Sequence, residues 1–312
     1  DHGANIAKLA ALYPEMQVVG NAKTFLYMDQ FFGADAVAKE RRVVVKDGES
    51  LSLGTHTLTF VFAPMVHWPE VMVSYESSEK VLFSADGFGR FGAVARFDEN
   101  ADWASEARRY YLNIVGKYGP QVQALLKKAA ALDIKTICPL HGLVWRSNPG
   151  KAIELYQRWS SYEAEDGVVV VYASMYGNTA KMADYIAHKI ADAGVKQIRV
   201  HDVSKTHISY LINDIWRFKG VVLGSCAYNT QMFPLMESLT RELVHIGVKN
   251  RYLGLFGSYS WNGGGVKNLK LFADEIGWEQ VAEPAEIMGR PACDKYAACD
   301  ALAAGMAGKL QH

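Results

Sequence analysis

The sequence predicts an α/β protein of two domains, and three observations support this prediction. The chain has 312 residues, which is longer than one typical domain. A helix expected over 148–162 is followed by the polar segment 163–167 and then by the apolar run 168–172, which is typical of a strand buried on both faces. Beyond this point strands and helices alternate regularly, as in a doubly wound parallel sheet. We therefore expect domains at 1–162 and 163–312.

Composition and charge argue against several classes of function. Half of the residues are hydrophobic, 21% are charged and the formal net charge is zero, so no overall field attracts nucleic acid or an anionic membrane. No apolar run approaches the roughly 20 residues that cross a bilayer. None of the cysteines is paired as Cys-x-x-Cys, so we expect no rubredoxin-type or zinc-ribbon site and a reducing, cytoplasmic setting. Because the chain begins with Asp1 rather than methionine, residue 1 is not expected to be the biological start.

The second domain is expected to contain five parallel strands connected by helices. Ligands of such sheets bind at the carboxyl ends of the strands, so the loops at that edge are candidates for a site. The strands are expected at 168–172, 197–202, 220–224, 251–256 and 279–283, and the helices at 179–193, 209–218, 233–246, 263–276 and 295–310.

The segment Ser174–Thr179 connects the first strand of this sheet to its first helix. A helix N-terminus offers unpaired N–H groups and the positive end of the helix dipole. The hydroxyls of Ser174 and Thr179, with backbone N–H groups around Gly177, can therefore bind a phosphate without a basic side chain. The alternative interpretation is an ordinary turn capped by Ser or Thr.

Two later loops lie at the same edge of the expected sheet. Residues 224–230 follow the third strand and residues 257–265 follow the fourth. Each loop combines glycines with an aromatic ring that can stack on a flat heterocycle, Tyr228 in the first loop and Tyr259 or Trp261 in the second. Three loops that suit a phosphate and a planar ring predict a flavin site.

Residues 167–312 resemble a flavodoxin, whose phosphate loop has the pattern Ser/Thr-x-Tyr/Thr-Gly-Asn-Thr. The resemblance implies that the cofactor is FMN. It assigns the phosphate to Ser174, Met175, Tyr176, Gly177, Asn178 and Thr179. It assigns the isoalloxazine ring and its surroundings to Cys226, Ala227, Tyr228, Asn229, Ser258, Tyr259, Ser260, Trp261 and Gly263.

The first domain is expected to mix strands with short helices and to carry a metal site. His67, Asp86 and His141 each follow an expected strand, and Asp1-His2 precedes a helical pattern. Imidazoles and carboxylates at strand ends along one edge are the ingredients of a metal site; the alternative is isolated polar residues in unrelated loops. The strands are expected at 17–19, 42–45, 58–63, 80–84 and 135–138, and the helices at 8–13, 106–115 and 122–131.

The order Asp-His, His, Asp, His resembles the metallo-β-lactamase fold, an αββα sandwich with a two-metal site. The N-terminal part of that fold, with its His-x-His or His-x-Glu motif, is absent from this sequence. Such a domain followed by a flavodoxin-like domain resembles the flavodiiron proteins over essentially the whole chain. The resemblance implies two non-haem iron ions with Asp1, His67 and His141 as ligands and Asp86 as the bridging carboxylate, and it places His2 where some members of the family have a ligand.

The resemblance also implies an oxidoreductase that reduces O₂ to water, NO to N₂O, or both, with electrons from FMN. It implies a rubredoxin-like or reductase electron donor and a head-to-tail homodimer, or a dimer of such dimers. Tyr110 or Tyr111 is expected to give a proton or hydrogen bond to the bound substrate. Two alternatives stay open: a zinc or manganese hydrolase joined to a flavodoxin domain, and a plain FMN electron carrier. An upstream His-x-Glu would indicate iron and His-x-His would indicate zinc.

Overall fold

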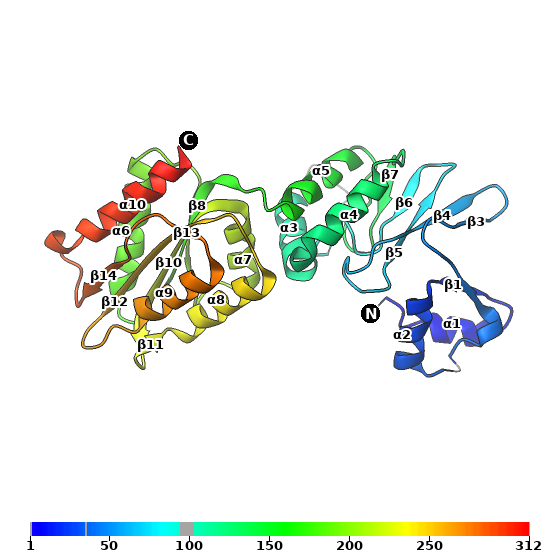
Figure 1. Cartoon of the computed structure of the whole chain (residues 1–312), viewed down its shortest axis with the longest axis horizontal. Coiled ribbons are helices and arrows are strands. Elements are labelled where there is room, and N and C mark those ends of the chain that lie inside the picture. Colours follow the sequence, from blue (N-terminus) through cyan, green and yellow to red (C-terminus); the bar gives the residue numbers. More distant parts are fainter. Residues whose placement is uncertain (1, 35, 94–102, 312) are drawn as a thin grey trace. The chain divides into compact units, whose positions relative to one another are not determined.

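The computed structural model describes residues 2–34, 36–93 and 103–311. The chain divides into two compact units, Asp1–Ser161 and Tyr162–His312, and each unit is described by itself (Figure 1). Among the described residues no helix has the length and apolar character to span a bilayer.

The second unit is built on a parallel sheet with the strand order β13-β12-β10-β8-β9. The three inner strands of this order are buried over most of their length because they consist mainly of apolar residues and are covered on both faces. This doubly wound sheet confirms the expected fold class of the second domain. Its strands are β8 (Glu165–Ala173), β9 (Ile198–Asp202), β10 (Phe218–Tyr228), β12 (Tyr252–Tyr259) and β13 (Glu279–Gln280).

The edge of this sheet differs from the single strand expected at 279–283. Here β13 pairs with the start of β12, and a separate strand β14 (Ala285–Met288) pairs with its end. Pro284 lies in the gap, where its missing N–H cannot join the ladder. A further short strand, β11 (Gln231–Met232), pairs antiparallel with the end of β10, so the sheet has seven strand segments rather than five.

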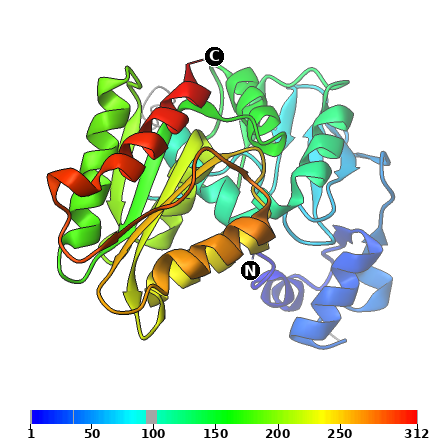
Figure 2. The ribbon, with the colours of Figure 1, turned by 60° about the vertical axis from the view of Figure 1, so that its left-hand side comes forward.

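Helices cover both faces of this sheet. Helices α6 (Asn178–Asp192) and α10 (Ala297–Leu310) pack on one face, where they bury Val168 and Val170 (Figure 2). The opposite face carries α7 (Ile208–Arg217), α8 (Pro234–Ile246) and α9 (Gly265–Ile276) (Figure 1).

The first unit contains a five-stranded sheet with the order β3-β4-β5-β6-β7. Its strands are antiparallel except for the pair β6 and β7, which is parallel. Helices lie along one side of this sheet (Figure 1). The strands are β3 (Ser50–Ser52), β4 (Thr57–Phe62), β5 (Met72–Glu76), β6 (Val81–Phe83) and β7 (Thr136–Cys138), and the helices are α3 (Trp103–Ile114), α4 (Gly119–Ala129) and α5 (Pro149–Ser160).

The N-terminal part of this unit forms a second, smaller layer. Its strands β1 (Val18–Gly20) and β2 (Arg42–Val44) form a parallel pair, and its helices are α1 (Ile6–Leu12) and α2 (Ala22–Phe32). Two sheets with helices agree with the expected sandwich. Three single-turn 3₁₀ helices complete the described elements: Lys39–Arg41, Gly116–Tyr118 and Cys293–Lys295.

The sequence pattern missed α2, β3 and β5 in this unit. The sequence does contain a signal for the start of α2: Asn21 is a residue type that favours the N-cap, and in the structure it accepts a hydrogen bond from the backbone N–H of Thr24. Strand β3 has only three residues, too few to show an alternating pattern.

Candidate metal centre and candidate flavin site

The parallel pairing of β6 with β7 brings two of the candidate metal ligands to one edge. Asp86 follows β6 by three residues and His141 follows β7 by three residues. The two loops are tied together, because the N–H of Leu140 donates to the carbonyl of Ala85 at 2.8 Å and the N–H of Arg90 donates to the carbonyl of His141 at 3.3 Å. The backbone therefore fixes Asp86 beside His141.

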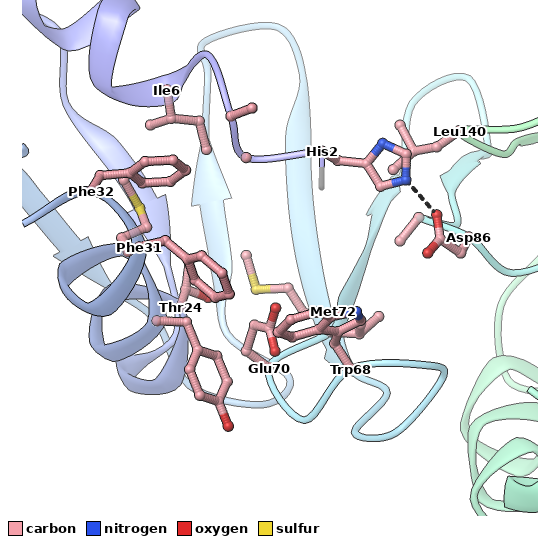
Figure 3. Close-up of a pocket in the computed structure, with 16 residues that line it drawn as sticks. His2, Ile6, Thr24, Phe31, Phe32, Trp68, Glu70, Met72, Asp86 and Leu140 are labelled. Atoms are coloured by element: carbon pink, nitrogen blue, oxygen red, sulfur yellow. Dashed lines mark hydrogen bonds and ion pairs between the residues drawn. The ribbon is translucent and has the colours of Figure 1, made fainter. Parts of the chain in front are cut away.

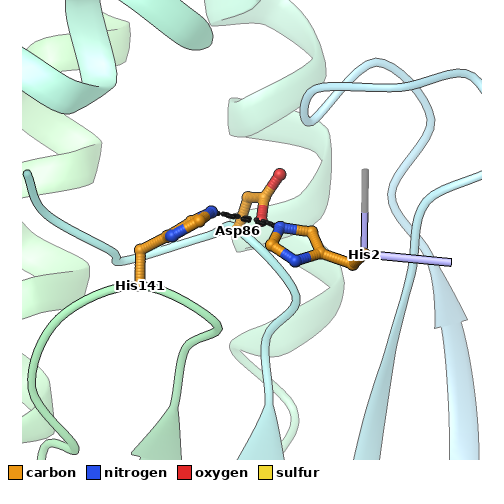
Figure 4. Close-up of side chains that lie close together, drawn as sticks. All are labelled: His2, Asp86 and His141. Carbon is orange, nitrogen blue, oxygen red and sulfur yellow. Dashed lines mark hydrogen bonds and ion pairs between the residues drawn. The ribbon is translucent and has the colours of Figure 1, made fainter. Parts of the chain in front are cut away.

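The carboxylate of Asp86 lies among three imidazoles. The Nε2 atoms of His2 and His141 lie 2.8 Å and 3.5 Å from Oδ1 of Asp86, and the same two Nε2 atoms are 3.1 Å apart (Figure 4). The Nε2 atom of His67 lies 2.9 Å from the other oxygen, Oδ2. Asp86 itself is 5% exposed. Each oxygen of one buried carboxylate thus faces different histidines.

This donor set fits a metal ion. One ligand atom from each of His2, Asp86 and His141 can be chosen so that all lie within 4.8 Å of one another. Imidazole and carboxylate ligands suit iron and zinc, and each of the two oxygens of Asp86 has an imidazole nitrogen within 2.9 Å. Asp1, the remaining candidate ligand, lies outside the described residues.

An apolar cavity of about 470 Å³ adjoins the cluster formed by the side chains of His2, Asp86 and His141 (Figure 3). His2, Glu70 and Asp86 contribute polar groups to its wall. Most of the other lining side chains are apolar, Phe31 among them. The cluster can therefore be approached from an apolar compartment of the first unit.

The two tyrosines that were candidates for a role at the metal centre have different surroundings in the structure. The ring of Tyr110 lies 5.5 Å from that of His141, centroid to centroid, and burial together with the charge of Asp86 raises the pKa of Tyr110. The ring of Tyr111 instead packs in the core against Tyr156, at 5.0 Å. Successive helical residues point about 100° apart, so only Tyr110 is brought to the site.

A second cavity, of about 680 Å³, lies at the carboxyl edge of the parallel sheet in the second unit. This volume is in the range of ordinary small-molecule sites. The ends of β10 and β12 line it together with the loops after β8, β10 and β12, at the edge of the sheet where the sequence predicted a site. The lining residues are Ser174, Met175, Tyr176, Asn178, Thr179, Cys226, Ala227, Tyr228, Asn229, Thr230, Ser258, Tyr259, Ser260, Trp261, Asn262 and Gly289.

Two predicted residues, Gly177 and Gly263, shape the loops without lining this cavity. Gly177 is the N-cap of α6 with φ +83°, in the left-handed region that favours glycine, and its N–H donates to Oγ of Ser174 at 3.1 Å. A side chain at Gly263 would come within 2.8 Å of the carboxylate of Glu286. The backbone conformation therefore explains Gly177, and the nearby side chain of Glu286 limits the space at Gly263.

The chemistry of the lining matches a phosphate at one end and a planar ring at the other. Among the described residues that line the cavity, none carries a charged side chain, so a phosphate there would be bound by hydroxyls and the N-terminus of α6. Tyr176 and Trp261 are 89% and 90% exposed. Exposed aromatic rings at the rim of a cavity can stack on a flat heterocycle.

Three lining residues were not among the predicted site residues. Thr230 and Asn262 belong to the two loops that the sequence indicated. The sequence therefore predicted where they lie but not that they line the cavity. Gly289 follows β14, and its N–H donates to the carbonyl of Tyr259 at 2.8 Å. The sequence did not predict the position of Gly289, because only one edge strand was expected and β14 was not.

Comparisons with known proteins match each half of the chain to a different family. Residues 1–142 match the family described as ODP family beta lactamase, and residues 170–300 match the family described as flavodoxin.

Longer relatives match both halves together. A nitric oxide reductase of Moorella thermoacetica is 32% identical over 290 residues, which cover 91% of this chain and 72% of that protein. An anaerobic nitric oxide reductase flavorubredoxin of Escherichia coli O1:K1 is 31% identical over 89% of this chain, and this chain spans 59% of its length.

A solved structure has the same arrangement of elements. The rubredoxin oxygen:oxidoreductase of Desulfovibrio gigas aligns with a TM-score of 0.92 and 28% identity, over 100% of this chain and 79% of that one.

Proposed function

We propose that this chain, which belongs to the flavodiiron protein family, is an oxidoreductase that reduces nitric oxide, dioxygen or both. In this proposal a non-haem diiron centre in the first unit receives electrons from FMN in the second. The relatives named as nitric oxide reductases favour NO as a substrate, and the relative named as an oxygen oxidoreductase favours O₂.

The observation that carries the proposal is the environment of Asp86. Its two oxygens face different histidines, with His67 near Oδ2 and His2 and His141 near Oδ1. In this proposal Asp86 would be a ligand shared by the two irons, His67 would hold one of them, and His141 and His2 would hold the other. Asp1 completes the proposed set in this chain. Two irons, when bound, supply electrons and a binding site for a small diatomic molecule.

The residues around the cluster suit an uncharged diatomic substrate. The adjoining cavity is lined largely by apolar side chains, which accept NO or O₂ without the desolvation that a charged substrate would require. We assign to Tyr110, whose buried ring lies beside that of His141, the role of donating a hydrogen bond from its hydroxyl to a bound oxygen atom.

The flavin cavity supports FMN as the electron source. We assign the phosphate to the loop Ser174–Thr179 and the ring to the loops that contain Tyr228 and Trp261. The donor to this flavin is proposed to be a rubredoxin-like protein or a reductase, and the working form a cytoplasmic homodimer.

Metal analysis and product analysis together test this function. Purified protein should hold about two irons per subunit and FMN, and it should convert NO to N₂O, measured by gas chromatography, with a chemical reductant as donor. The substitution His67→Ala should abolish this turnover. His188→Ala is a matched control, because the described contact of His188 is a hydrogen bond with the carbonyl of Asp184 in its own helix. Zinc alone, together with hydrolytic activity, would contradict the proposal.

A further inference from the structure

A hydrogen bond inside the flavin cavity joins two loops that were expected to serve different parts of the ligand. Oγ1 of Thr179, in the phosphate loop, lies 2.8 Å from Oγ of Ser258, near the end of β12. The two residues are 1% and 8% exposed, and both line the cavity. Ser258 therefore contacts the phosphate end of the site although its loop was assigned to the ring.

The position of Ser258 is held by the sheet. Ser258 pairs with Cys226 of β10 on one side and with Ile287 of β14 on the other. A residue held between two strands has little freedom to move, and a β-branched residue such as Thr179 has a restricted side-chain torsion. The positions of the two hydroxyl oxygens are thus restricted before a ligand binds.

The direction of the hydrogen bond follows from the number of protons. Each hydroxyl has one proton to donate, whereas an ionised phosphate oxygen can only accept. When Thr179 donates its proton to a phosphate, the bond with Ser258 can persist only if Ser258 is the donor. A hydroxyl that already accepts a hydrogen bond is a stronger donor to the next acceptor.

We propose that Ser258 is a positioning residue of the phosphate subsite, which orients the hydroxyl of Thr179 toward the phosphate and so favours FMN over riboflavin. This inference rests on the proposed flavin site and adds the residue that makes the site selective for the phosphorylated flavin. Riboflavin lacks the phosphate and does not require the hydroxyl of Thr179 to have a particular orientation.

Titration of the flavin-free protein with FMN and with riboflavin, followed by flavin fluorescence, tests the inference. Ser258→Ala should weaken FMN binding about fivefold, the effect of one hydrogen bond in a network that ends on a charged group, and leave riboflavin binding unchanged. Unchanged riboflavin binding also shows that the variant is folded. In a Thr179→Val background the same substitution should cause no further loss of FMN affinity, because Ser258 acts only by orienting the hydroxyl that Thr179→Val removes.

A matched control is Ser260→Ala, since Ser260 lines the same cavity two residues later but is exposed. This control should change the ratio of FMN to riboflavin affinity by less than Ser258→Ala does. Equal losses of both flavins in Ser258→Ala, or no loss of FMN affinity, would overturn the inference while leaving the flavin site intact. Failure of the unsubstituted protein to bind either flavin would overturn the flavin site and this inference with it.

Discussion

Two neighbouring tyrosines of the first unit differ in their surroundings because their side chains leave the same helix in different directions. Tyr110 and Tyr111 are neighbours in α3, yet Tyr110 packs against His141 and Tyr111 packs against Tyr156 and Trp159. The sequence could place both residues in a helix near the metal loops. It could not choose between them, because the phase of a helix is set by what it packs on.

The two tyrosines give a matched pair of variants. Tyr110→Phe should lower the turnover number for NO or O₂ by about 10- to 100-fold, the low end of what a positioned proton donor contributes. Tyr111→Phe should leave turnover unchanged, because its ring faces the core. Steady-state kinetics on both variants, with iron content measured alongside, provide the test; equal losses in the two variants would remove Tyr110 from the proposed site.

Glu76 makes the stability of the first unit dependent on pH. Hydrogen bonds from the backbone N–H groups of Glu79 and Ser78 lower the pKa of Glu76 to about 2, from an ordinary value of 4.5. A lowered pKa means that the folded state binds the proton less tightly than the unfolded state. The stabilisation is therefore complete above pH 4.5 and is lost as the pH falls toward 2.

Thermal unfolding at several pH values tests this linkage. The unfolding temperature of the wild-type protein should fall more steeply between pH 4.5 and about 2 than that of Glu76→Gln. Glu79→Gln is the control, because Glu79 contributes its backbone N–H rather than its side chain to the hydrogen bond with Glu76. Parallel curves for the wild-type protein and Glu76→Gln would contradict the assignment.

At the scale of elements, the proposed phosphate site depends on the backbone conformation of the loop before α6. Gly177 has φ +83° at the N-terminus of α6, and Gly194 has φ +97° just after its C-terminus. Alanine at either position should destabilise the protein by about 1 kcal/mol because of the left-handed backbone. Gly177→Ala should also weaken FMN binding, whereas Gly194→Ala should not. Loss of FMN binding in both variants would show that general destabilisation causes it.

The elements that the sequence predicted correctly are those with a strong local signal. The apolar run 168–172 became the core of β8, and the segment Ser174–Thr179 lies at the junction of β8 and α6, as its position between an expected strand and helix indicated. The split edge strand was missed because β13 and β14 are defined by pairing with β12 rather than by their own pattern. The position of Asp86 beside His141 likewise depends on the pairing of β6 with β7, which no local pattern shows.

At the scale of the whole molecule, the proposal requires electrons to pass between the two units. In the proposed head-to-tail homodimer, the flavin of one subunit serves the metal centre of the other. A closed twofold dimer has two such pairs of sites.

Mixed dimers test the proposed transfer of electrons from the flavin of one subunit to the metal centre of the other. Asp86→Asn should disable the metal centre, and Ser174→Asp should exclude FMN by placing a negative charge in the phosphate loop. When the two variants are co-expressed in equal amounts, about half of the dimers are mixed and each has one working pair of sites, so about a quarter of the wild-type activity should return. Activity no higher than that of the separate variants, or a monomer in light scattering, would contradict an electron path between subunits.

The central claim is that FMN delivers electrons to a substrate held at the cluster around Asp86. Stopped-flow absorbance of the pre-reduced, FMN-loaded protein mixed anaerobically with NO measures this transfer directly. The account predicts rapid flavin oxidation in the wild-type protein, and oxidation at least about 100-fold slower in Asp86→Asn, with FMN content unchanged. Equal rates in the two proteins would show that the flavin reacts without the metal centre and would contradict the account.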